Sequence, residues 1–154
     1  MLLIQHVHPI LVHFPIVFML TLAVLDALAS ARGYAVIGRG AVGNVSAGLA
    51  VLAGGFAVVT YIFGGMALDV AESGGFHSDI AETHEALGEF TAIAFAVWAF
   101  VRIFLWWRNA KLGRAVSGAV ALVEIAGAAL VVATAYYGGQ LVYDLGVNVA
   151  HMAG

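Results

Sequence analysis

The stretch "HPILVHFPIVFMLTLAVLDALA" at residues 8–29 begins a run of apolar side chains that decides the fold. A helix of about 20 such residues is long enough to cross the hydrocarbon core of a bilayer. The run exceeds the usual apolar core of a signal peptide, and no Lys or Arg precedes it, so we expect a retained helix. Three similar runs follow, and the predicted spans are residues 9–29, 41–68, 79–107 and 115–143.

The overall composition is also that of an integral membrane protein. Of the 154 residues, 63% are hydrophobic and only 10% are charged, whereas soluble domains have about 25% charged residues. No basic patch of the kind that binds nucleic acid is present, and a chain without cysteine has no disulfides, thiolate metal sites or iron–sulfur clusters. Because the connections are short, we expect one domain over residues 1–154, an all-α, up-down bundle of four membrane-spanning helices.

Charge is distributed unevenly along this predicted bundle. All basic side chains lie in or beside the first and third connections, namely Arg32, Arg39, Arg102, Arg108, Lys111 and Arg114. The positive-inside rule therefore predicts that these connections are cytoplasmic and that both termini lie on the outer side, which would be the periplasm in a bacterial inner membrane. All histidines map to that outer end, namely His6, His8, His13, His77, His84 and His151.

Two of these histidines fall inside predicted spans at matched depth. Pro15 should kink the first helix near His13, and His84 follows the start of the third span by one to two turns. Both lie roughly 6–8 Å below their helix starts. A single histidine near an interface is usually an interfacial or capping residue, but polar residues inside a span are costly and usually functional. His13 and His84 are therefore our first prediction for a pair of ligands.

The chemistry of such a pair leaves several cofactors open. Haem b, one or two per chain, would use His13 and His84 as axial ligands, with His8 and His77 as the second choice. Gly88 lies four residues after His84 on the same helical face and would leave room for a flat haem. Alternatively, the outer histidines bind or transport Cu or Zn together with carboxylates, for which Asp79, Glu85 and Glu89 are the candidates.

Three charged residues lie deeper, in the cytoplasmic halves of the spans: Asp26, Arg102 and Glu124. We expect Arg102 to neutralise one acid and to extend its side chain to the interface. The alternative is that these residues form a proton route or the edge of a quinone site.

Several motifs together resemble one known family. They are "HPILVHFPI" with Asp26 later in the same helix, "HEALG" at residues 84–88, and "YYGGQLVYDLGVNV" at residues 136–149. The chain resembles, over nearly its whole length, the bacterial membrane family catalogued as domain of unknown function 2231. The resemblance implies a four-helix membrane domain, and relatives are sometimes fused to Rieske-type or cytochrome c-type domains.

The resemblance also bears on the candidate ligands. By motif, the positions that transfer to this chain are His8, His13 and His84. The last motif of the family commonly has a histidine where this chain has Leu145. If that histidine is a ligand in relatives, either this chain lacks the ligand or His151 replaces it. Binding of a second haem would depend on which of the two holds.

Our prediction from the sequence is a haem b-binding, cytochrome b-like membrane protein that passes electrons between membrane quinol and a redox partner outside. It would be an electron-transfer subunit rather than a stand-alone enzyme. We expect it to work in the lipid bilayer within a larger membrane redox complex or as a homo-oligomer. The other functions that stay open are the Cu or Zn protein and a cofactor-free structural subunit of a larger complex.

Overall fold

A computed structural model describes residues 6–147 of the chain. The helices within this range are α1 (Val7–Leu11), α2 (His13–Ala31), α3 (Ala41–Ser73), α4 (Asp79–Trp107) and α5 (Arg114–Tyr143). Four helices are long and apolar enough to cross a membrane, with α1 and α2 together forming the first, Val7–Ala31. The prediction of an all-α protein with four membrane-spanning helices is therefore confirmed.

The first span is interrupted beside Pro15. Proline has no N–H to donate to the carbonyl of Leu11, and its ring crowds that carbonyl, so a helix is kinked or broken at this point. The helix is indeed divided at Val12, between α1 and α2. His8 and His13 consequently belong to different helical segments.

The connection between α3 and α4 is shorter than the apolar runs suggest. Helix α3 continues past residue 68 to Ser73, because the polar residues that follow the apolar run are still compatible with a helix in water. The chain then turns at Gly75, whose φ of 89° favours glycine. Helix α4 begins after Ser78, whose hydroxyl accepts a hydrogen bond from the backbone N–H of Ile80 at 3.2 Å.

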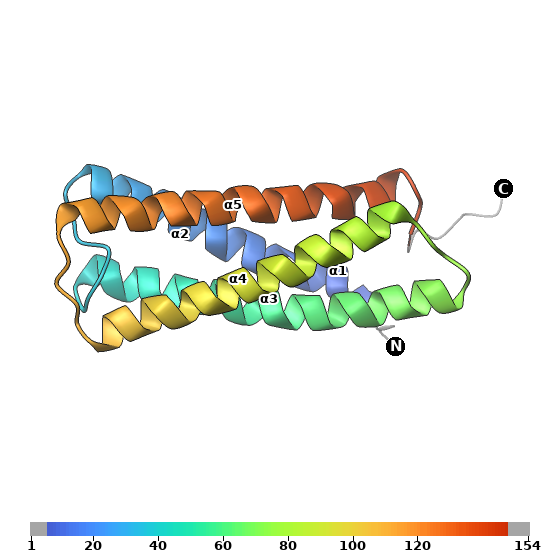
Figure 1. Ribbon diagram of the computed structural model, residues 1–154, viewed down its shortest axis with the longest axis horizontal. Coiled ribbons are helices and arrows are strands. Elements are labelled where there is room, and N and C mark those ends of the chain that lie inside the picture. Colours follow the sequence, from blue (N-terminus) through green and yellow to red (C-terminus); the bar gives the residue numbers. More distant parts are fainter. Residues whose placement is uncertain (1–5, 148–154) are drawn as a thin grey trace.

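The long helices form a closed ring in the order α2, α3, α4 and α5, with each packed against the next and α5 packed against α2. Helix α1 packs against α2 and α3. Figure 1 shows that α1 begins and α5 ends at the same end of the bundle, where α3 also meets α4. We call this the histidine end. The basic end is the opposite one, which carries the connections 32–40 and 108–113.

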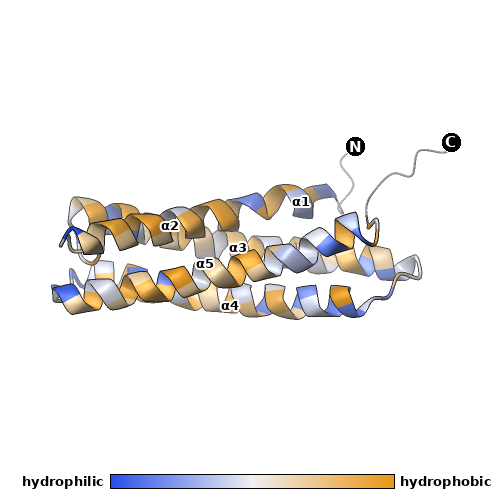
Figure 2. Cartoon of the chain, turned by 90° about the horizontal axis from the view of Figure 1, so that it is seen from above, coloured by the Kyte–Doolittle hydropathy of each residue, from blue (hydrophilic) through white to orange (hydrophobic). Residues whose placement is uncertain are grey.

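Small side chains and a few large ones fill the interior. The main core cluster consists of Met19, Leu22, Ala50, Ala53, Ala57, Phe95 and Val131. Helix α3 approaches α4 closely at Gly54, where a Cβ atom would lie 2.7 Å from the Phe95 carbonyl oxygen. Large apolar side chains such as Phe100, which is 69% exposed, cover the outside. Figure 2 shows hydrophobic residues along the middle of the helices, with hydrophilic residues concentrated toward the ends, as a lipid environment requires.

Candidate functional site

His8 is held between α1 and α3. Its Nδ1 lies 3.0 Å from the backbone carbonyl oxygen of Thr60. Because a carbonyl oxygen only accepts hydrogen bonds, Nδ1 is the protonated nitrogen and donates. In the neutral ring, Nε2 then carries the lone pair that can bind a metal.

His84 is held in the same way between α4 and α5. Its Nδ1 donates to the backbone carbonyl oxygen of Thr134 at 3.0 Å, which leaves the lone pair on Nε2 here as well. The Thr134 hydroxyl in turn donates to the Leu130 carbonyl and lies 3.0 Å from the hydroxyl of Thr91. Both histidines are half-buried.

The two ring environments are built from the same local sequence. Helix α3 carries "TYIFGG" at residues 60–65, and α5 carries "TAYYGG" at residues 134–139. On a helix, the residue four positions after a carbonyl lies directly beside that carbonyl. A ring that reaches the threonine carbonyl must therefore pass over the first glycine. A Cβ atom on Gly64 would lie 2.9 Å from Cε1 of His8, and one on Gly138 would lie 2.9 Å from Cε1 of His84.

The structure brings His8 and His84 together. Their ring centroids are 6.2 Å apart, and the ring planes are inclined at 76°. Matched depth in the sequence pairs His84 with His13, but the residue that faces His84 is His8. The fold thus assembles a pair of imidazole rings, each oriented by a backbone carbonyl on a neighbouring helix.

The other candidate residues lie outside this pair. His13 is exposed, and its Nδ1 lies 3.4 Å from the Ile10 carbonyl oxygen in the preceding turn. His77 is exposed in the connection before α4. Gly88 is half-buried and faces α3, since a Cβ atom there would lie 3.9 Å from Tyr61 Cδ2.

Two further histidines are candidates from the sequence. His6 is exposed at the start of the described range, and His151 lies outside the described residues.

Carboxylates do not complete a metal site beside the histidines. Asp79, Glu85 and Glu89 are all exposed. Within residues 6–147, no three His, Asp or Glu side chains come together in a way that could hold a metal ion. One polar atom near the pair is left over: the Thr60 hydroxyl is buried and has no hydrogen-bond partner among the described residues.

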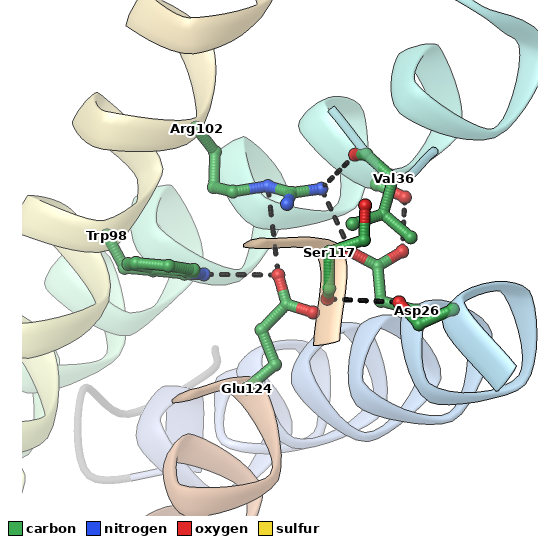
Figure 3. Close-up of polar contacts among 8 residues, drawn as sticks. Asp26, Val36, Trp98, Arg102, Ser117 and Glu124 are labelled. Carbon is green, nitrogen blue, oxygen red and sulfur yellow. Dashed lines mark hydrogen bonds and ion pairs between the residues drawn. The ribbon is translucent and has the colours of Figure 1, made fainter. Parts of the chain in front are cut away.

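A second polar site lies in the basic half of the bundle, where Asp26, Arg102 and Glu124 meet from α2, α4 and α5 (Figure 3). Arg102 Nη2 lies 2.9 Å from Asp26 Oδ2 and also donates to the Val36 carbonyl at 2.9 Å. Arg102 Nε lies 3.7 Å from Glu124 Oε1, which accepts a hydrogen bond from Trp98 Nε1 at 3.2 Å.

The expectation that Arg102 extends to the interface is wrong, although it does neutralise an acid as expected. The residue is only 3% exposed, and its guanidinium group points inward between the two carboxyl groups. An Arg102 side chain that extended to the interface would leave both acids buried without a cation. Pairing inside the bundle avoids that cost.

A comparison with protein families supports the resemblance noted in the sequence. No curated protein and no solved structure matches the chain. The model of the family described as "Predicted membrane protein (DUF2231)" matches residues 5–151, which is nearly the whole chain. The chain therefore belongs to this family of membrane proteins.

Proposed function

We propose that the chain binds one haem b at the histidine end, with His8 and His84 as the two axial ligands of the iron. The observation that carries the proposal is the arrangement of the two rings. Each ring donates through Nδ1 to a backbone carbonyl, and this leaves Nε2 free to bind a metal. Hydrogen bonds of this kind orient metal-binding histidines and raise their basicity.

The separation of the rings supports a shared metal. A bond between imidazole nitrogen and a metal is about 2.0–2.1 Å long, and the ring centre lies about 1 Å beyond the nitrogen, so two rings on opposite sides of one ion are about 6 Å apart. The observed separation of the centroids is 6.2 Å.

The number of available protein ligands favours haem over a bare ion. Zinc sites generally use three or four protein ligands. The described residues bring only two histidines together, without a third metal-binding side chain. A haem supplies four ligands itself and needs only two from the protein. A Cu or Zn protein therefore has less support than a haem protein, and a cofactor-free structural subunit remains an outcome of the experiment below.

The ligand pair suggests a role in electron transfer. When bound, a haem supplies one-electron redox chemistry, and two axial histidines leave no open position for a substrate. The work of this chain would be to orient the two rings, exclude water and hold the site within the bilayer. We propose that electrons pass between membrane quinol and a redox partner on the periplasmic side, within a larger complex or a homo-oligomer.

The direct test is the visible absorption of the purified protein, produced with ample haem. The protein is reduced first by a quinol and then by dithionite. We expect a sharp α band on reduction, with about one haem per chain. A well-folded protein without such a band would overturn the haem proposal and would leave the metal-binding and structural alternatives to be tested by elemental analysis and co-purification.

A further inference from the structure

The buried cluster of Asp26, Arg102 and Glu124 has more acids than cations. The exposed fractions of these residues are 0%, 3% and 0%. If all three were ionised, the cluster would carry one uncompensated negative charge inside a membrane-spanning bundle, where charge is costly. The other groups that form hydrogen bonds with the cluster are uncharged. They are Ser46 of α3, Trp98 of α4 and the backbone carbonyl of Val36.

The two acids are not equally supplied with hydrogen-bond donors. Asp26 accepts hydrogen bonds from the Ser46 hydroxyl and from Arg102 Nη2. Glu124 accepts one from Trp98 through Oε1, but its Oε2 is buried and has no partner among the described residues. A buried carboxylate oxygen without a donor is costly, and a proton on that oxygen removes its charge.

We propose that this cluster is a buried proton-binding site, in which one proton resides mainly on Glu124 Oε2, the carboxyl oxygen that has no partner among the described residues. The proton makes the cluster neutral. The site is independent of the haem proposal, because it lies in the opposite half of the bundle and uses none of the same residues.

The proton would be out of contact with water in this structure. A narrow crevice at the basic end lies between the loop at Gly38, the start of α3 at Gly43 and the end of α4 at Trp106, and of the three charged residues in the cluster only Arg102 lines it. The crevice has no room for a water molecule in this conformation, and both acids are fully buried.

Infrared spectroscopy tests the proposal on the purified full chain at neutral pH. A protonated carboxylic acid has a carbonyl stretching band that a carboxylate lacks, and the band shifts in D₂O. We expect a band equivalent to one group per chain. It should disappear in Glu124→Gln and persist in the control Glu85→Gln, which changes an exposed acid at the histidine end.

Isotope labelling makes the assignment without any substitution. In wild-type protein grown with ¹³C-carboxyl glutamate, the band should move to lower frequency, because Glu124 is buried in the cluster and the other glutamates are exposed. Absence of a protonated-acid band at neutral pH would overturn the proposal. So would a band that is unaffected by glutamate labelling, or one that survives in both Glu124→Gln and Asp26→Asn.

Discussion

The residues that position the two histidine rings include two glycines that contact them. Alanine at position 64 would place its Cβ 2.9 Å from Cε1 of His8, whereas Gly65 has open space around its Cβ position. Replacing either glycine by alanine stabilises the helix by about 1 kcal/mol through its higher helix propensity. We therefore predict that Gly65→Ala is neutral or stabilising, and that Gly64→Ala costs about 1–3 kcal/mol through overpacking. Denaturant titration in micelles measures the difference.

The same comparison is available on α5, with Gly138→Ala as the test and Gly139→Ala as its control. A Cβ at Gly138 would meet the His84 ring, whereas the nearest atom to one at Gly139 is 4.0 Å away on Tyr143. Equal stabilities for the two variants of either pair would contradict the packing of the rings described above.

Arg102 is predicted to be the most sensitive charged residue. Removing the cation leaves the Asp26 carboxylate buried without its ion-pair partner, and breaking a buried ion pair in this way typically costs about 3–5 kcal/mol. We therefore expect Arg102→Met to lower the free energy of unfolding by about that amount. The control Arg108→Met changes an exposed residue on the same segment of chain and should have an effect within about 0.5 kcal/mol. Similar effects for the two variants would show that the cluster contributes little to stability.

At the scale of the helices, the division between α1 and α2 sets the direction in which His8 points. Pro15 prevents a continuous helix, so Pro15→Ala should restore the hydrogen bond to the Leu11 carbonyl and join the two segments. We expect the change in the junction between α1 and α2 to move His8 away from the Thr60 carbonyl. We expect slower amide exchange around residues 11–15 and a lower haem content. Pro9→Ala is the control, because Pro9 lies in the first turn of α1, where an N–H has no helical partner. If amide exchange is unchanged in Pro15→Ala, a cause other than Pro15 divides α1 from α2.

At the scale of the whole molecule, the charge distribution predicts the orientation in the membrane. The chain has no cysteine, so a single introduced cysteine reports on one position. Lys111→Cys lies at the basic end, and Glu72→Cys lies near the opposite end. In intact bacteria, we predict that a membrane-impermeant thiol reagent labels only the second variant. Labelling of only the first variant would invert the orientation and would place the histidine end in the cytoplasm.

The global architecture could be predicted from the sequence because it depends on average properties. The length of the apolar runs determines which segments cross the bilayer, and the short connections make successive helices neighbours. Helix ends were less predictable: α3 continues to Ser73 because polar residues end an apolar run without ending a helix.

The pairing of the histidines could not be predicted from depth alone. His8 and His13 are separated by five positions, which corresponds to about 140° around a helix even without the break at Val12. Depth does not specify this rotation, and the structure directs His8, rather than His13, toward His84. The repeated T-x-x-x-G-G pattern at residues 60–65 and 134–139 is a sequence signal that could have indicated where the two rings are held.

The reduced-minus-oxidised spectrum of single variants shows whether His8 and His84 act together at one site. The variants are His8→Ala, His84→Ala and, as a matched control on an exposed histidine of the same end, His13→Ala. We predict that each of the first two abolishes or shifts the same α band, and that the control keeps the wild-type band. A wild-type band in either His8→Ala or His84→Ala, or its loss in His13→Ala, would show that His8 and His84 are not the pair of ligands.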